Sequence, residues 1–183
     1  MNDPVLEAVV RAAVSATGAT GGWLVASRGD ELELVAVAGD VDPGIVGSRV
    51  SGSAGVAGYV VGSGQPLALS AGRDDPRLSE GAAASIGRRP SSVVCVPCED
   101  DGVVAGALEL IDKAGGGSFS FDDVELATLL AGIAAAALTS GSDGRTAVPT
   151  PEQLAHRLRA LAAVDARRYA TTATVVASLL DRD

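Results

Sequence analysis

The chain has 183 residues, of which 47% are hydrophobic and only 3% aromatic, which predicts one domain of ordinary size plus an appendage, with a core packed from small side chains. Its formal net charge of −9, from 23 acidic and 14 basic residues, argues against nucleic acid and membrane surfaces as partners, because both attract basic patches. No apolar run approaches the length of about 18 residues that a membrane span needs, and no signal-peptide pattern opens the chain, so with its two cysteines we expect a cytoplasmic protein.

A helix followed by a β-hairpin is predicted for residues 3–38. Asp3 and Pro4 are typical of a helix start, because Asp caps the first amides and Pro fits the first turn. Apolar residues then recur at helical spacing up to the glycines at 18, 21 and 22, which we expect to end the helix. Residues 23–27 and 31–38 predict the two strands, with a turn between them.

A short helix, a short strand and a long polar loop are expected next. Residues 39–52 are rich in Gly, Asp and Pro and predict a loop. Ser53 is a good helix cap, and Gly64 is a good helix end. Residues 66–70 predict a strand. The polar stretch 71–91 predicts a loop whose length is typical of functional segments.

A second hairpin and a long helix complete the predicted domain. Residues 92–98 and 103–112 have the pattern of paired strands, and Ser120 with Asp123 forms a capping box that opens a helix. That helix carries an apolar stripe at helical spacing: Leu126, Leu129, Leu130, Ile133 and Ala137. Residues 140–150 have the composition of a linker, and residues 151–183 predict a helical C-terminal extension with a leucine stripe of its own. The order of elements predicts an α+β domain with an antiparallel sheet.

Sequence blocks between Gly55 and Asp123 carry a family resemblance. They read GVAGYVVGSGQPL, DPRL, VCVP, GVVAGALELIDK and FSFDD, in that order. Together they resemble the GAF family of small sensory and regulatory domains. The resemblance implies a GAF-like, PAS-related antiparallel six-stranded sheet with helices on both faces over residues 1–139. It also implies a ligand cavity beneath the inner helices and loops.

Polar and charged residues in and beside the long loop are the candidate ligand-binding residues. Arginine forks and a helix N-terminus can hold an anionic or polar ligand, so the loop would form one wall and the helix near Ser53 another. The alternative is a solvated loop whose charges pair with each other or with water. The candidates are Ser53, Tyr59, Asp74, Asp75, Arg77, Arg88, Arg89, Ser91 and Ser92.

Half of a cyclic-nucleotide signature is present near the last helix of the domain. GAF domains that bind cyclic nucleotides often carry Asn-Lys, then Phe, three residues and Asp-Glu. This chain has Asp112 before Lys113, retains Phe119 and Asp123, and has Val124 in place of the Glu. The missing Asn and Glu argue against cyclic-nucleotide binding. We interpret Lys113, Phe119 and Asp123 as a structural signature that pins the helix to the sheet end, with an ion pair between Lys113 and Asp123.

The cysteines and the single histidine do not form a recognisable catalytic or metal site. Cys95 and Cys98 lie in a strand pattern and should point to opposite faces, so they predict buried structural residues rather than a reactive pair. Zinc would need further soft ligands, and only His156 in the extension is available. The absence of any earlier His excludes haem held by a GAF-domain histidine, and the positions of the cysteines argue against a covalent bilin.

The sequence therefore favours a non-enzymatic regulatory domain that binds a small molecule or a partner protein. Its terminal helices would transmit the state, as a homodimer, to a separate signalling or regulatory protein. A ligand-independent dimeric interaction module is the first alternative. A thiol-based enzyme similar to the GAF-like methionine sulfoxide reductases is the second, although both cysteines lie in the wrong element for that chemistry. The identities of the ligand and of the partner stay open.

Overall fold

A computed structural model of the chain describes residues 3–70, 75–81, 84, 87 and 89–143, and the isolated positions 159, 162 and 170. Backbone contacts divide the chain into two units, Met1–Ser142 and Asp143–Asp183. A helix spans Phe121–Asp143, so the first residues of the predicted linker, 140–143, are helical. The rest of the linker and the extension 151–183, apart from those isolated positions, lie outside the described residues.

The first unit consists of six strands, three α-helices and two short 3₁₀ helices within the described ranges. In chain order these are α1 (Pro4–Thr17), β1 (Ala19–Arg28), β2 (Glu31–Gly39), η1 (Pro43–Ile45), β3 (Arg49–Ser51), α2 (Gly55–Ser63), β4 (Leu67–Ser70), η2 (Pro76–Ser79), β5 (Ser92–Asp100), β6 (Val103–Lys113) and α3 (Phe121–Asp143). No helix in the ranges described is both long and apolar enough to cross a membrane.

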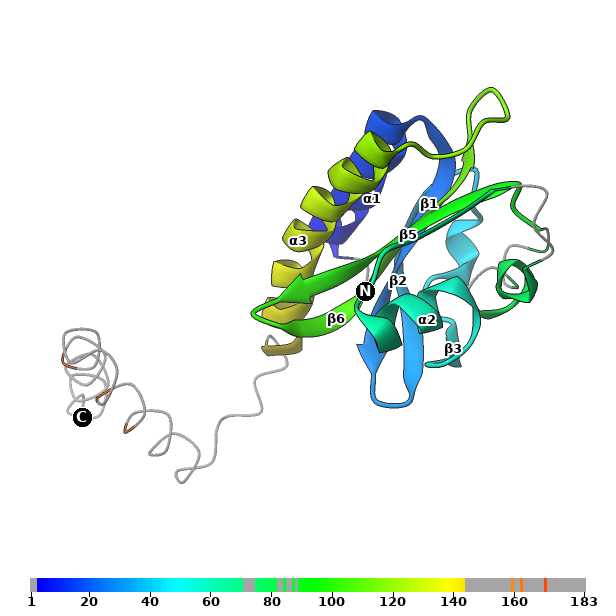
Figure 1. Cartoon of the computed structure of the whole chain (residues 1–183). Helices are drawn as coiled ribbons and strands as arrows, with labels where there is room; N and C mark the ends of the chain where they lie inside the picture. The colour runs from blue at the N-terminus through cyan, green and yellow to red at the C-terminus, as the bar shows by residue number, and fades with distance from the viewer. Residues whose placement is uncertain are drawn as a thin grey trace. The chain divides into compact units, whose positions relative to one another are not determined.

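The strands form one antiparallel sheet in the order β3-β2-β1-β6-β5-β4. Helices α1 and α3 lie side by side on one face of this sheet, and α2 lies on the other (Figure 1). We call the second face the cover face, and its cover consists of α2, η1 and η2. The structure confirms the α+β fold and the six-stranded antiparallel sheet with helices on both faces.

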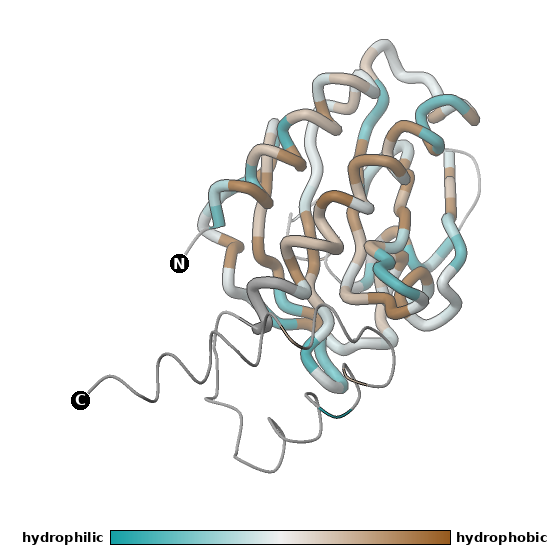
Figure 2. The backbone as a smooth tube through the Cα atoms, turned by 90° about the vertical axis from the view of Figure 1, so that its left-hand side faces the viewer, coloured by the Kyte–Doolittle hydropathy of each residue, from teal (hydrophilic) through white to brown (hydrophobic). Residues whose placement is uncertain are grey.

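Each face of the sheet has its own apolar core. The core under α1 and α3 is built largely from alanine, valine and leucine. The core under the cover contains Trp23, Cys95 and Leu78 among aliphatic residues. The hydrophobic stretches lie mainly along the strands and helices, whereas many hydrophilic ones lie at the turns (Figure 2). The central strands β1 and β6 contribute side chains to both cores, because successive residues of a strand point to opposite faces.

The predicted end of the first helix is correct at Gly18 and wrong at the two later glycines. Gly18 is the left-handed C-cap of α1, with a φ of 65°. Gly21 and Gly22 instead belong to β1, which begins at Ala19. A Cβ on Gly22 would lie 2.6 Å from Cδ2 of Leu110. Glycine is therefore needed here for close packing of β1 on β6.

Ser53 does not cap α2, contrary to the prediction. The helix begins at Gly55, its N-cap is Ala54, and no side chain accepts a hydrogen bond from its first turn. Gly55 has a φ of +70°, a conformation that glycine adopts without strain. The backbone geometry of Gly55, rather than a serine cap, therefore sets the start of α2.

Helix α3 packs on the sheet through its alanines. Ala127, Ala131, Ala134 and Ala135 are buried. In the predicted apolar stripe, by contrast, Leu129 is 72% exposed and Ile133 is 53% exposed. Small residues allow the helix to approach the sheet closely. Leu129 and Ile133 are left on the outer face, whereas Leu130 and Ala137 of the predicted stripe pack against the core.

Candidate ligand-binding site

Part of the predicted loop site does come together on the cover. Arg77 donates to both carboxylate oxygens of Asp75, from Nε at 2.9 Å and from Nη2 at 2.6 Å. The Arg77 guanidinium lies 4.9 Å from the ring centroid of Tyr59 in α2, a cation–π distance. Arg89 donates to the backbone carbonyl of Asp75 at 3.2 Å. Asp74 and Arg88 lie outside the described residues.

These contacts tie the cover together. The side-chain hydrogen bonds from Arg77 lower the pKa of Asp75 from 3.8 to about 2, so its carboxylate stays charged and paired with Arg77. Leu78 of η2 is buried in the core beneath. The η2 segment is thus held to α2 by an Arg–Tyr stack above and by an apolar anchor below.

The predicted serine candidates do not join that cluster. Ser91 donates to Oδ1 of Asp112 through its amide at 2.6 Å and its hydroxyl at 2.8 Å. The hydroxyl of Ser92 accepts from the amide of Lys113 at 2.9 Å. Both serines therefore fasten the start of β5 to the end of β6. Ser53 lies elsewhere, exposed, with its hydroxyl 3.2 Å from that of Ser51.

Lys113, Phe119 and Asp123 form a contact set at the opposite end of β6 from the β5–β6 turn. Lys113 Nζ lies 2.8 and 2.7 Å from the two carboxylate oxygens of Asp123 and 5.7 Å from the Phe119 ring centroid. Burial acts to raise the pKa of Asp123, but the hydrogen bonds from Lys113 and Ser120 outweigh it and lower the pKa below 3.8. The ion pair and the capping box expected from the sequence are both present.

A buried polar pair that the sequence analysis did not single out lies on the cover face of the two central strands. Trp23 of β1 and Glu109 of β6 are direct partners in the strand register. Trp23 is fully buried and Glu109 is 1% exposed. Within the described part of the chain, neither Trp23 Nε1 nor Glu109 Oε1 has a hydrogen-bond partner. Buried polar atoms in native proteins are rarely left in this state.

Burial changes the acid–base behaviour of Glu109. Burial raises the pKa of Glu109 from 4.5 to about 8. A hydrogen-bond interaction with the Trp23 indole, which falls short of the geometry of a formed hydrogen bond, offsets only part of the rise. The carboxyl group therefore holds its proton at neutral pH. One signal in the sequence could have pointed to this residue: Glu109 alternates with Ala107 and Ile111 along a strand that is otherwise apolar on that face.

Cys95 is the register partner of Glu109 on the other side, in β5. Cys95 belongs to the core under the cover and Cys98 to the core under α1 and α3, so the two thiols lie on opposite faces as predicted. Burial raises the pKa of Cys95 well above 9.0, with Glu109 adding to the rise, and raises that of Cys98 to about 12. Both thiols are therefore held protonated, the unreactive form.

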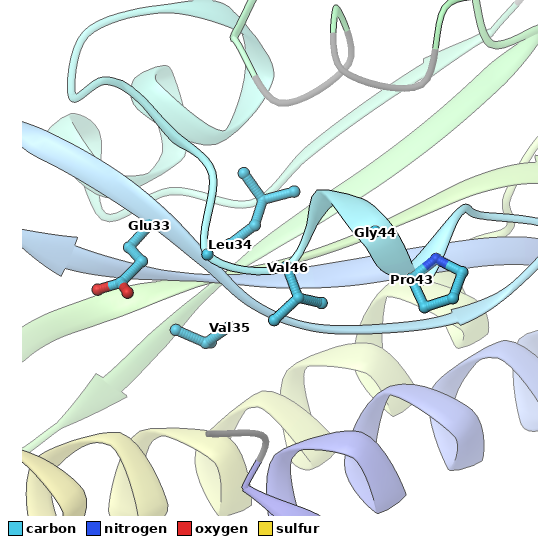
Figure 3. A pocket seen from close by; sticks show the side chains of 7 residues that line it. Glu33, Leu34, Val35, Pro43, Gly44 and Val46 are labelled. Atoms are coloured by element: carbon cyan, nitrogen blue, oxygen red, sulfur yellow. The ribbon is translucent and has the colours of Figure 1, made fainter.

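A surface pocket of about 330 Å³ lies apart from the Trp23–Glu109 pair, between β2 and η1 (Figure 3). It is lined by Glu33, Leu34, Val35, Pro43, Gly44, Val46 and Gly47. Its carboxylate, on Glu33, already lies 3.1 Å from Nε of Arg28 and 3.9 Å from Nη2 of Arg49. This pocket therefore offers little unsatisfied chemistry to a ligand. Among the described residues, no group of His, Cys, Asp and Glu could hold a metal ion.

The family of the chain follows from comparison with known proteins. A family model described as GAF domain matches residues 3–139. The chain belongs to the GAF family. This is a family of regulatory and sensory domains, so the coarse prediction of a regulatory domain type is confirmed.

Solved GAF structures have the same fold. The second GAF domain of DevS from Mycobacterium smegmatis is 25% identical, with a TM-score of 0.60 over 78% of this chain and 96% of that one. The GAF domain of an Acinetobacter phosphoenolpyruvate-protein phosphotransferase is 18% identical, with a TM-score of 0.64 over 75% and 81%. A free methionine-R-sulfoxide reductase from Neisseria meningitidis, solved with its substrate, is 21% identical, with a TM-score of 0.58 over 78% and 81%. At 18% and 21% identity, the last two matches show only that the fold is shared.

Proposed function

We propose that this GAF domain is a regulatory module that binds a small molecule on the cover face of its sheet. The observation that carries the proposal is the Trp23–Glu109 pair, whose Nε1 and Oε1 are buried without a hydrogen-bond partner among the residues described. Leaving such atoms unsatisfied costs about 1–3 kcal/mol each. A bound molecule that pairs with them would recover that free energy. The Arg77–Tyr59 stack and Leu78 of η2 would close the site from above.

Strand β6 gives the site a direct route to the terminal helices. Glu109 points to the cover face, while its neighbours Leu108 and Leu110 belong to the core under α1 and α3. A shift of β6 on ligand binding would therefore change the packing of both helices. In this proposal the two helices carry the signal to a separate regulatory protein.

The outer face of α3 supports a homodimer as the signalling form. Leu129 and Ile133 are exposed, and Leu126 precedes them at the spacing of a helix-pairing seam. A Cβ on Gly132, between them, would meet nothing within 4 Å, so a second helix could approach closely there. A second copy of the chain would bring an identical stripe to this face.

Binding and melting measurements on the full chain test the proposal. Differential scanning fluorimetry with nucleotides, amino acids and other metabolites should reveal a compound that raises the melting temperature, because a ligand of the folded state stabilises it by mass action. Native mass spectrometry should show two copies of the chain. A dimer that responds to no compound would instead support the ligand-independent interaction module.

The reductase alternative has a direct test of its own. The buried, protonated state of Cys95 and Cys98 argues against a thiol reaction. We expect no thiol-dependent reduction of free methionine sulfoxide by the full chain. Activity that disappears in the Cys95→Ala, Cys98→Ala double variant would establish the enzyme instead.

A further inference from the structure

The two unsatisfied atoms of the Trp23–Glu109 pair have complementary chemistry. The indole Nε1–H of Trp23 can only donate a hydrogen bond, whereas the carboxyl Oε1 of Glu109 can accept one. The strand register places the two residues opposite each other on the central strands β1 and β6. A molecule that reaches both atoms must therefore present an acceptor to one and a donor to the other.

The surroundings of the pair are apolar. Its neighbours in the core under the cover are aliphatic side chains and the Cys95 thiol, among them Val25, Val93, Ala107 and Ile111. The charged groups of Asp75 and Arg77 are already paired with each other. Among the described residues no Lys or Arg pairs with Glu109, so a charged ligand group would enter an environment that does not solvate it.

We propose that the Trp23–Glu109 pair recognises the uncharged edge of an amide-like group, such as a carboxamide or a lactam, on the ligand of this domain. The amide carbonyl accepts from Trp23 Nε1, and the amide N–H donates to Glu109 Oε1. This inference rests on the small-molecule function proposed above and names the chemistry of its recognition.

The protonation state of Glu109 supports a neutral partner. Because burial raises its pKa to about 8, the carboxyl group is largely uncharged at pH 7. An uncharged carboxyl group forms hydrogen bonds with an amide edge without any proton transfer. A cationic ligand would require the carboxyl group to lose its proton on binding, and an anionic ligand would lie against an acceptor oxygen.

The chain provides its own reporter for the experiment. Trp23 is its single tryptophan, so intrinsic tryptophan fluorescence comes from the proposed site. The full chain at pH 7 would be titrated with acetamide and benzamide, and in parallel with benzoate and benzylammonium as charged counterparts of benzamide. We expect a saturable fluorescence change and a rise in melting temperature with the amides, and neither with the charged probes.

Two variants test the assigned atoms. Glu109→Leu removes the acceptor and keeps a similar volume, so we expect at least a tenfold loss of amide affinity in a folded protein. Trp23→Phe removes the donor and keeps an aromatic ring, and we expect a similar loss of amide affinity. Because this variant has no tryptophan, its binding is measured by the rise in melting temperature. Glu109→Gln keeps an acceptor oxygen and should retain measurable binding.

The possible outcomes separate this inference from the proposed function. Equal amide binding by the parent chain and by Glu109→Leu overturns the recognition assignment, while the small-molecule function stands. If benzylammonium binds in preference to benzamide and a proton is released, the pair recognises a cation. This overturns the assignment of an uncharged amide partner but leaves the small-molecule function standing. Failure of every probe, with a crystal structure showing only an ordered water between Trp23 and Glu109, overturns the inference. If a metabolite screen also fails, the proposed function fails with it.

Discussion

Lys113 and Asp123 join the end of β6 to the first turn of α3. The Lys113 ammonium lies 2.8 and 2.7 Å from the carboxylate oxygens of Asp123, and it also donates to the carbonyl of Thr17 at the end of α1 at 2.5 Å. Lys113 therefore connects β6, α1 and α3 on the face of the sheet that carries the two long helices. The Asp123 side chain is mostly buried, at 10% exposure, so its interactions are less screened than those of a surface pair.

Replacing Asp123 should destabilise the domain. Asp123→Ala removes the capping-box acceptor of the Ser120 amide and the charge-assisted hydrogen bonds from Lys113, and we expect a loss of about 2 kcal/mol in the free energy of unfolding. Asp122→Ala, in the same turn but exposed, is the matched control and should cost about 0.5 kcal/mol or less. Urea denaturation followed by Trp23 fluorescence measures both. Equal losses in the two variants would show that the ion pair contributes nothing specific.

The stabilisation that Asp123 gives to the folded state should depend on pH. Its pKa is lowered in the folded state, so the unfolded chain takes up this proton first as the pH falls. The stabilisation is therefore present above the ordinary pKa of 3.8 and is lost as the pH falls below it. The difference between the parent chain and Asp123→Ala should shrink in that range.

The raised pKa of Glu109 should make the free energy of unfolding fall as the pH rises, which is opposite in sign to the effect of Asp123 and occurs at higher pH. The unfolded chain releases this proton near 4.5 and the folded chain near 8, so between these values the folded state binds more protons. The free energy of unfolding should then fall as the pH rises through this window, by at most about 1.4 kcal/mol per pH unit from this group. Denaturation at several pH values between 5 and about 8 measures it.

Glu109→Gln is the control for that slope. Glutamine does not titrate and retains a similar shape, while every other titratable group of the chain is unchanged. The downward slope should therefore be largely absent in this variant. An identical slope in the parent chain and in Glu109→Gln would mean that another group titrates and that Glu109 is ionised in the folded protein.

The glycine contact between α2 and the η2 segment should be intolerant of a side chain. Gly81 has a φ of +61°, and a Cβ there would lie 2.6 Å from the carbonyl oxygen of Ala54. Gly64 has a similar φ of +67°, but the nearest atom to its Cβ would be Val104 Cγ2 at 3.9 Å. Gly81→Ala should thus cost more than Gly64→Ala, which carries the backbone strain alone at about 1 kcal/mol.

Thermal denaturation and limited proteolysis measure this difference. We expect Gly81→Ala to lower the melting temperature more than Gly64→Ala and to expose the cover to protease, because the backbone of Glu80 and Gly81 must move away from that of Ala54 and Gly55. If the two variants behave alike, the η2 segment is not seated on α2 as described.

Local chemistry explains which parts of the fold could be predicted from the sequence. Asp3 caps α1, and Ser120 with Asp123 opens α3, because both signals act within a few residues. Ser53 failed as a cap because the start of α2 depends on Gly55 and on a distant segment at Gly81. Such a contact between separate parts of the chain leaves no periodic pattern.

The candidate site was predictable only in part for the same reason. Asp75, Arg77 and Arg89 lie in one polar stretch, so a cluster could be expected from their proximity in sequence. Trp23 and Glu109 lie in different strands, and their pairing requires the β1–β6 register. Strand alternation places Glu109 with Ala107 and Ile111, but it does not reveal which face carries the cover.

Charged substitutions at the two exposed residues of α3, Leu129 and Ile133, should weaken self-association of the chain. Leu129→Glu with Ile133→Glu should leave the stability of the single domain within about 0.5 kcal/mol, because both side chains are exposed. In the proposed dimer the same changes bring like charges together and should shift the chain to a monomer in analytical ultracentrifugation. Val103→Glu, at the 62% exposed first position of β6, is the matched control and should leave the association constant unchanged. The Leu129→Lys, Ile133→Lys variant excludes an effect of added negative charge on a chain of net charge −9. If both charged pairs remain dimeric, the interface lies elsewhere on the chain.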